Sequence, residues 1–200
     1  MKLKHLFQME HPAKTLALGC ESIDQYMDRV RDYAVTKRLD PDEQCDLERK
    51  IIGDGFELFG EFFVRHYATD NRILIRDYSL LTISDNGIDA RGVDDRTGYP
   101  VFIQYKGYRE YYGDKAVVLT GEHLNTFVAE CYMVLREENA SKEQYDNARM
   151  VVITTARELA RYTKETKFRN LVECFPVQHL RDLTISRGFW EQFAESIRSV

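Results

Sequence analysis

Several kinds of sequence feature are missing from this chain, and each absence narrows the class of protein. No apolar run approaches the ~20 residues needed to span a bilayer, and there is no internal repeat or low-complexity tract. Residues 1–5 lack the apolar region of a secretory signal. The four cysteines, at positions 20, 45, 131 and 174, contain no C-x-x-C pair, so a zinc site or disulfide framework is not expected. We therefore expect a cytoplasmic protein without membrane association.

Familiar catalytic motifs are missing as well. The chain has no G-x-x-x-x-G-K-[ST] phosphate loop, no G-x-S-x-G nucleophile elbow and no H-E-x-x-H zinc motif. Gly53 and Gly55 are not followed by the third glycine of a dinucleotide fingerprint, because Leu58 occupies its position. The five histidines show no metal-ligand spacing. These absences argue against the corresponding nucleotide-binding and hydrolytic chemistries.

The pattern of apolar residues predicts an α/β fold with a mixed central β-sheet of about five strands flanked by helices. Two hundred residues suit one domain, with room for a small appendage. Short apolar runs alternate with helical patterns, as in α/β cores. Strands are expected at residues 72–76, near residue 89, near residue 104, at 150–154 and at 171–175. Helices are expected at residues 121–138, at 155–168 and after residue 176.

A helical N-terminal extension is predicted over residues 1–52, packed on a core over residues 53–200. A capping box at residues 22–25 begins one helix that should run to about residue 38. A proline at the first helical position begins the next at Pro41. That helix is expected to end near residues 53–55, where two glycines occur, and a third helix to begin at Phe56.

The most informative segment is a pair of short apolar runs joined by a turn expected at residues 95–98. Asp89 stands at the start of the first run, and the second ends in Gln104 and Lys106. Side chains i and i+2 of a β-strand share a face, roughly 6.6 Å apart, so Gln104 and Lys106 point the same way. If the two strands pair through the turn, Asp89 lies near both. A carboxylate, an amide oxygen and an ammonium group at one sheet edge can bind a divalent metal and stabilise charge on a phosphate attacked by water.

This arrangement resembles the PD-(D/E)xK nuclease superfamily, and within it the branch similar to the Mrr restriction enzymes. Members carry a Gly-Ile-Asp element, here residues 87–89, a variable hairpin, and an apolar strand ending in Gln-x-Lys, here residues 104–106. The family also places a glutamate on the preceding helix, in a Phe-Glu pair that matches residues 56–57. Downstream it has an apolar strand, small polar residues and a helix, which match residues 150–160. The resemblance covers roughly residues 50–185.

The resemblance implies a restriction-endonuclease-like fold and a Mg²⁺-dependent endonuclease that hydrolyses DNA, leaving a 5′-phosphate and a 3′-hydroxyl. Mn²⁺ is expected to replace Mg²⁺. Glu57 and Asp89 would hold the metal, Gln104 would help to position it or the attacking water, and Lys106 would stabilise the transition state. Gln104 stands where much of the superfamily has Asp or Glu, so the site would hold two carboxylates rather than three. Such domains are often joined to helicases or modification-reading modules, and cleavage of both strands often requires two sites, which is compatible with a homodimer.

The choice of Glu57 over Glu61 also follows from a helical wheel. The helix that contains them buries a face of aromatic residues at positions 56, 59 and 63. Glu57 lies at the border of that face, from which a carboxylate can reach a sheet edge, whereas Glu61 is expected further toward solvent. Both could instead be solvated surface glutamates.

Asp89, Gln104 and Lys106 also have possible structural roles that need no metal or substrate. Asp89 could bond its own backbone in a turn. Gln104 could be a polar strand residue, and Lys106 could protect a sheet edge. Asp94 and Asp95 are expected to belong to the hairpin turn.

Two regions are candidates for contact with nucleic acid. The stretch after residue 105 interleaves tyrosines with basic residues that could stack on bases or bind phosphates, although a half-buried aromatic edge explains it equally well. Its candidates are Tyr108, Arg109 and Lys115. On the helix expected after residue 155, a basic stripe with i, i+4, i+7 spacing could contact phosphate or be a solvated face. It consists of Arg157, Arg161 and Lys164.

The formal net charge of −5 argues against DNA as the partner, because proteins that bind phosphates usually show a basic surface. Carboxylates are needed for metal-dependent hydrolysis, however, and a locally basic groove can coexist with an acidic total. One alternative is therefore a binding or assembly module that keeps the nuclease fold without turnover. Another is a junction resolvase or an RNA-directed nuclease, since the same site cuts several nucleic acids.

Overall fold

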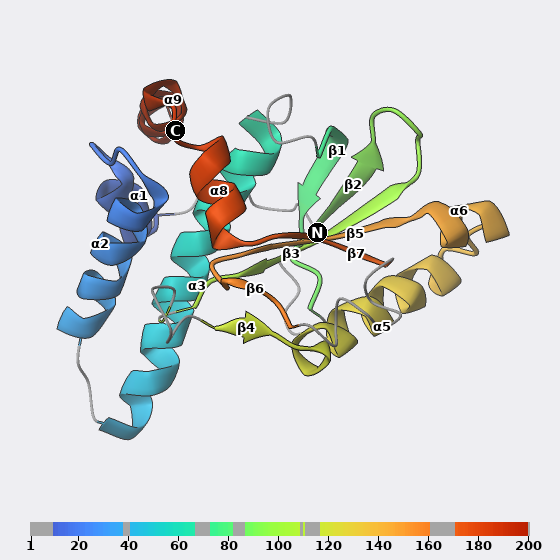
Figure 1. Ribbon diagram of the computed structural model, residues 1–200, viewed down its shortest axis with the longest axis horizontal. Helices are drawn as coiled ribbons and strands as arrows, with labels where there is room; N and C mark the ends of the chain where they lie inside the picture. The colour runs from blue at the N-terminus through green and yellow to red at the C-terminus, as the bar shows by residue number, and fades with distance from the viewer. Residues whose placement is uncertain are drawn as a thin grey trace.

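A five-stranded mixed β-sheet forms the centre of the computed structural model, which describes residues 10–37, 41–66, 73–81, 87–108, 110, 117–160 and 171–199 (Figure 1). In spatial order its strands are β1 (Ile75–Leu80), β2 (Ala90–Asp94), β3 (Pro100–Lys106), β5 (Arg149–Thr154) and β7 (Val172–Phe175). The first three strands are antiparallel, and β3, β5 and β7 are parallel. The predicted α/β class and mixed sheet are confirmed.

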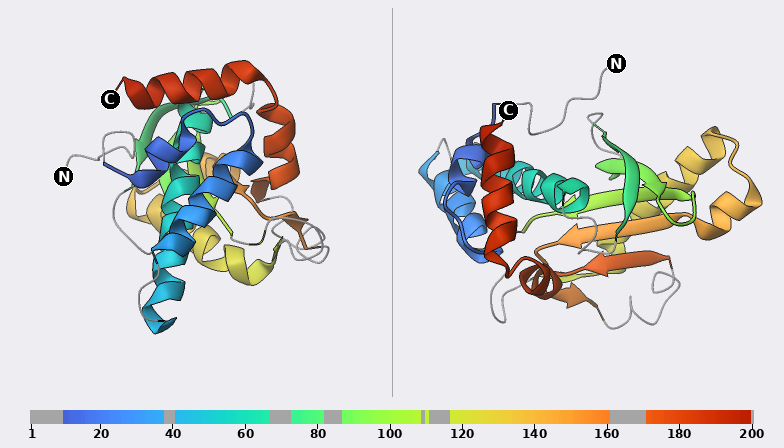
Figure 2. Two further views of the ribbon diagram at one scale, coloured as in Figure 1. Left: turned by 90° about the vertical axis from the view of Figure 1, so that its left-hand side faces the viewer. Right: turned by 90° about the horizontal axis from the view of Figure 1, so that it is seen from above.

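Helices cover both faces of this sheet and enclose two hydrophobic cores (Figure 1). One core lies between the sheet and α1 (Pro12–Ala17), α2 (Ile23–Thr36), α3 (Pro41–His66), α8 (Val177–Leu183) and α9 (Arg187–Arg198). The other lies beneath α5 (Gly121–Glu137), beside α6 (Lys142–Asn147). Figure 2 shows α1, α2 and α9 together at one end of the molecule and α6 at the other. None of the helices in the described residues is both long and apolar enough to cross a membrane.

Alternation along β3 separates the two cores. Val101, Ile103 and Tyr105 belong to the core beneath α3, whereas Phe102 belongs to the core beneath α5. The predicted period of two is thus confirmed, because successive side chains of a strand point to opposite faces. Gln104 consequently lies on the α5 side of the sheet.

The expected helix break at residues 53–55 is wrong, because α3 continues from Pro41 to His66. Both glycines lie inside the helix, where α2 packs closely against it. A Cβ on Gly55 would stand only 2.8 Å from Cγ1 of Val30, and the Tyr26 hydroxyl donates to the Gly55 carbonyl at 2.8 Å. Tertiary packing therefore outweighs the low helix propensity of glycine. The expected boundary between residues 52 and 53 falls within this helix.

The first strand begins later than the expected residues 72–76. β1 starts at Ile75 and continues to Leu80, and residue 72 lies outside the described residues. The preceding Leu74 has φ = 49°, which interrupts the extended chain at that point. A second interruption occurs inside β1, where Asp77 has φ = 54° and the register with β2 shifts.

The prediction of a helix at residues 155–168 is also wrong for its first residues. Residues 158–159 form the short strand β6 (Glu158–Leu159), which pairs in parallel with β4 (Val118–Leu119). Two backbone bonds strengthen this pairing, from the N–H of Arg157 to the carbonyl of Val117 at 2.8 Å and from Ala160 to Leu119 at 2.6 Å. Residues 161–170, where the rest of that helix was expected, lie outside the described residues.

The remaining predicted elements are found close to their expected positions. Ser22 caps α2 by accepting from the N–H of Gln25 at 3.1 Å, and α5 spans the predicted residues to within one position. β5, β7 and the two closing helices α8 and α9 are likewise present. The short helices α1 and α6 and the strand β4 were not predicted.

Candidate active site

Asp89 immediately precedes β2 and is held against the neighbouring strand β3. Its backbone N–H donates to the carbonyl of Ile103 at 2.9 Å, and its Oδ2 accepts from the backbone N–H of Tyr105 at 2.6 Å. The carboxylate therefore bonds across the sheet rather than within its own turn. The hairpin forms with its turn at the expected residues 95–98, and it brings Asp89 beside the end of β3 as predicted.

Burial makes the charged form of Asp89 costly. Desolvation raises the pKa of this carboxyl group to about 6, against the lowering effects of the Tyr105 N–H and of the Lys106 ammonium group. The pKa of Lys106 is itself lowered by burial, and the charge of Asp89 partly offsets the shift. The two side chains thus interact electrostatically in a partly desolvated setting, where a charge acts more strongly than in water.

Glu57 approaches the same place from α3. Burial raises its pKa to about 8, and the neighbouring carboxylates of Asp89 and Asp54 contribute to the rise. Two glycine contacts explain why the helix can come so near to β3. A Cβ on Gly60 would lie 2.4 Å from the ring of Tyr105, and one on Gly107 would lie 2.6 Å from Cβ of Phe56. Close packing at both positions therefore fixes Glu57 beside the end of the strand.

Glu61 does not lie toward solvent as expected. Its side chain is fully buried, with 0% exposure, and pairs with Arg65 at 2.9 Å. The helical wheel failed here because β1 packs across this part of α3 and places Tyr78 near the carboxylate. The charge of Glu61 acts on Tyr78 and Tyr105, whose hydroxyl groups bond each other at 3.0 Å. Glu61 thus belongs to a buried polar cluster under the sheet.

Gln104 is buried on the α5 face, with 5% exposure. Its Oε1 has no hydrogen-bond partner among the described residues. Its Nε2 lies 3.2 Å from the position that a Cβ on Gly87 would occupy, which the left-handed Gly87 (φ = 75°) leaves empty. A buried carbonyl oxygen without a donor costs free energy, of order 1–3 kcal/mol, unless a ligand or water satisfies it.

The sequence did not single out the threonines at the end of β5, Thr154 and Thr155, although they hold the end of β3 in place. Thr154 Oγ1 donates to the Lys106 carbonyl at 2.8 Å, and Thr155 Oγ1 accepts from the Tyr108 N–H at 2.7 Å. Both threonines are fully buried. Their position at the carboxyl end of a buried parallel strand was the available signal, since such strand ends commonly carry functional residues.

Two of the six residues expected to contact nucleic acid, Tyr108 and Arg157, lie in the described part of the chain. Tyr108 is half-buried, packs with the core beneath α5 and meets His123 edge-to-face at 6.1 Å. Arg157 is exposed and lies 3.7 Å from Glu158, but it stands in a bend rather than on a helix. The other candidates, Arg109, Lys115, Arg161 and Lys164, lie outside the described residues.

The donor set at this edge suits a hard cation without forming a closed cage. Glu57 and Asp89 are two neighbouring carboxyl groups with raised pKa values, and Gln104, next to Tyr105 in β3, has an amide oxygen without a partner among the described residues. Oxygen ligands of this kind are preferred by Mg²⁺, which usually keeps several waters. No group of three or more His, Cys, Asp or Glu side chains able to hold a metal occurs in the described part of the chain. The predicted count of two carboxylates is compatible with that observation.

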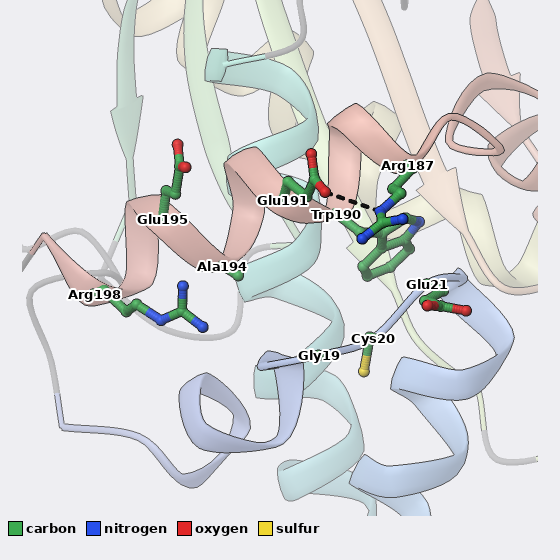
Figure 3. Close-up of a pocket in the computed structure, with 9 residues that line it drawn as sticks. All are labelled: Gly19, Cys20, Glu21, Arg187, Trp190, Glu191, Ala194, Glu195 and Arg198. Carbon is green, nitrogen blue, oxygen red and sulfur yellow. Dashed lines mark hydrogen bonds and ion pairs between the residues drawn. The ribbon is translucent and has the colours of Figure 1, made fainter.

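A separate cavity of about 330 Å³ lies between α9 and the turn joining α1 to α2 (Figure 3). Its lining includes Cys20, Trp190 and an exposed ion pair between Arg187 and Glu191. None of the nine lining residues is a candidate site residue.

Comparisons with protein-family models, with curated proteins and with solved structures found no match for this chain. A functional assignment must therefore rest on the sequence pattern and on the geometry at the end of β3.

Proposed function

We propose that this chain is a Mg²⁺-dependent endonuclease that hydrolyses DNA phosphodiester bonds, with a restriction-endonuclease-like core. The observation that carries the proposal is the placement of Glu57 and Lys106 on either side of Asp89, whose charge raises the pKa of Glu57 and offsets the lowering of the pKa of Lys106 by burial. Glu57 lies on α3, Asp89 immediately precedes β2 and Lys106 is the last residue of β3, so the three come from separate elements. Groups with strongly shifted pKa values cluster at functional sites. The raised pKa values of Glu57 and Asp89 therefore favour a catalytic role over that of ordinary surface carboxylates.

Glu57, Asp89 and Gln104 are the residues that would hold the metal. Bound there, Mg²⁺ would supply positive charge to the scissile phosphate and lower the pKa of a coordinated water. The unpartnered Oε1 of Gln104 fits this role, because a cation would satisfy an acceptor that has no donor among the described residues. Mn²⁺ should act in place of Mg²⁺.

Lys106 provides the cationic group of the proposed mechanism. Its ammonium group would orient the attacking water and stabilise the negative charge that develops on the phosphate oxygens. Asp89 keeps Lys106 charged by offsetting the effect of burial on its pKa. Proposed products are a 5′-phosphate and a 3′-hydroxyl, formed by direct attack of water.

The second candidate function is a binding or assembly module with the same fold and no turnover. The net charge of −5 favours it, since nothing in the total charge draws the chain toward DNA. Under this alternative the chain binds DNA or a protein partner and cuts nothing in Mg²⁺ or Mn²⁺. Helicase or modification-reading partners and a homodimer are compatible with either function.

The deciding experiment measures cleavage of plasmid and single-stranded DNA in Mg²⁺, Mn²⁺ or EDTA. We expect metal-dependent cutting by the wild type, and a loss of roughly 10²–10³-fold or more in Asp89→Ala and Lys106→Ala. Matched controls are Asp146→Ala and Lys142→Ala, which change exposed residues of α6 and should leave the rate unchanged. Metal-dependent cutting that persists in Asp89→Ala would place the active site elsewhere. DNA binding by a wild type that cuts nothing would favour the module.

A further inference from the structure

Tyr78 packs against the core beneath α3 because β1 contains a bulge. Residues 77 and 78 of β1 stand opposite the single residue Gly92 of β2, between two regular stretches of pairing. The extra residue reverses the alternation of side chains, so Tyr78 packs on the same core as Ile75, three positions earlier. Asp77 adopts φ = 54° at this point, a conformation that is uncommon for residues other than glycine. Bulges that re-aim a side chain in this way are frequent next to active sites.

The hydroxyl groups of Tyr78 and Tyr105 bond each other at 3.0 Å and so join β1 to β3. Tyr105 is only 6% exposed, and its ring lies against α3 where Gly60 leaves room, since a Cβ there would stand 2.4 Å away. The guanidinium group of Arg65 covers the ring of Tyr78 at 5.6 Å from its centroid, and Arg65 pairs with the buried Glu61. Contacts from three elements therefore hold the two rings in place.

The backbone of Tyr105 belongs to the candidate site, although its ring lies in the core. Its N–H donates to Oδ2 of Asp89 at 2.6 Å, the one hydrogen bond that this carboxylate accepts among the described residues. Glu57 is close to the other tyrosine, because burial is the main cause of the raised pKa of Tyr78 and the charge of Glu57 adds to it. The tyrosine pair thus adjoins both carboxyl groups of the site, and a shift of the Tyr105 ring would move the donor to Asp89.

We infer that Tyr78 is a positioning residue for the proposed hydrolysis, which acts through Tyr105 to hold the backbone donor against Asp89. The inference rests on the proposed nuclease function and deepens it, because it assigns a role in the reaction to a residue that touches neither metal nor substrate. The buried hydroxyl of Tyr105 has Tyr78 as its partner among the described residues. Without that partner the ring must shift to find another, since an unsatisfied buried hydroxyl is costly. Small misplacements of catalytic groups in turn slow the chemical step.

The test compares Tyr78→Phe with the double variant Tyr78→Phe/Tyr105→Phe, which removes both hydroxyl groups and leaves none in the pair unsatisfied. In Tyr78→Phe, the amide proton of Tyr105 should move upfield in the ¹⁵N–¹H spectrum as its bond to Asp89 lengthens. Cleavage of a duplex DNA oligonucleotide in Mg²⁺ should show kcat lowered about 10- to 100-fold in Tyr78→Phe, with KM within about twofold of wild type. In the double variant, the amide signal of residue 105 and kcat should return toward the wild-type values.

Tyr99→Phe is the matched control, because it also removes a bonded tyrosine hydroxyl, here one that donates to Glu143, and it should change neither reading. Urea unfolding identifies conditions in which every variant is folded, and both measurements are made there. A wild type that cuts DNA, with an unchanged amide signal and kcat in Tyr78→Phe, would overturn the inference and leave the nuclease intact. A kcat that stays low in the double variant would overturn it too. A wild type that cuts nothing would overturn the proposed function and this inference with it.

Discussion

Two aspartates flank β2, half-buried Asp89 just before the strand and buried Asp94 at its end, and their surroundings differ. Asp94, the last residue of the strand, accepts from the N–H groups of Arg96 and Thr97 at 3.0 and 2.9 Å, from the Thr97 hydroxyl, and from Arg149. Burial alone would raise its pKa, but Arg149 and the other donors lower it below the usual value. Asp89, just before the strand, has one backbone donor among the described residues and a raised pKa.

This difference separates a carboxylate that stabilises the hairpin from one that we propose acts at the candidate site. The donors around Asp94 satisfy its charge in the folded chain, so the residue stabilises the hairpin turn and needs nothing further. Asp89 instead has Glu57 as a neighbouring carboxyl group and raises its pKa, so ionising both groups together costs stability. Sequence alone shows two aspartates five positions apart; only the surrounding donors distinguish them.

Replacing each aspartate by asparagine should give the largest contrast. Asp94→Asn leaves Arg149 without its buried partner and should cost about 3–5 kcal/mol of unfolding free energy. Asp89→Asn removes a carboxylate whose ionisation is disfavoured in the fold, so at pH 7.5 its stability should equal or exceed that of the wild type. Urea unfolding in EDTA measures both, with the exposed Asp95→Asn as control. Equal losses at positions 89 and 94 would remove the distinction.

The pH dependence of the unfolding free energy should show directly what it costs to ionise the carboxyl groups of the candidate site. The pKa of Glu57 rises from its ordinary value of 4.5 to about 8 in the fold, so the folded chain holds a proton that the unfolded chain has released. Stability should therefore fall as pH increases from about 4.5 to 8, and Asp89 should add to the fall up to about pH 6. At pH 8, Glu57→Gln should be more stable than the wild type by on the order of 2–4 kcal/mol.

Urea unfolding at pH 5, 6, 7 and 8 in EDTA provides the comparison for Glu57→Gln. The exposed Glu137→Gln on α5 is its matched control and should follow the wild-type curve. Wild-type and Glu57→Gln curves that run parallel across this range would show that Glu57 is not strained by its surroundings.

A divalent cation should reverse part of this strain, with a smaller effect. A cation at a concentration ten times its dissociation constant stabilises the folded state by about 1.4 kcal/mol. Mn²⁺ should therefore raise the melting temperature of the wild type, and EDTA should abolish this increase. Asp89→Asn and Glu57→Gln should lose the response, whereas Asp146→Asn should keep it. Calorimetry at pH 7 in buffers of different ionisation enthalpy should detect proton release on binding, because Glu57 is protonated there. A response unchanged in both site variants would place the cation elsewhere.

Local sequence patterns were sufficient to predict the hairpin and its polar edge. The period of two along β3 put Gln104 and Lys106 on one face, and the turn at residues 95–98 put Asp89 opposite them. These predictions succeeded because register and alternation are set by neighbours in the sequence. The continuous apolar run at residues 150–154 likewise predicted a strand buried on both faces, which is β5 of the mixed sheet.

The errors arose where distant segments override a local signal. Gly53 and Gly55 suggest a helix end, but close packing of α2 keeps α3 intact. The helical wheel placed Glu61 in solvent because it contains no information about β1, which covers that face. A threonine pattern at residue 155 suggested a helix cap, yet the same hydroxyl accepts from Tyr108 instead.

The unbroken α3 has a consequence for how this chain can be divided. Twenty-six residues of helix measure about 39 Å, and that single rod contains both the surface that binds α2 and the glutamate of the candidate site. Dividing the chain after residue 52 would cut α3 in two. It would also separate Val30 and Tyr26 from Gly55, against which they pack. The N-terminal helices and Glu57 should thus open and close as one cooperative unit in hydrogen exchange, rather than as an appendage and a core.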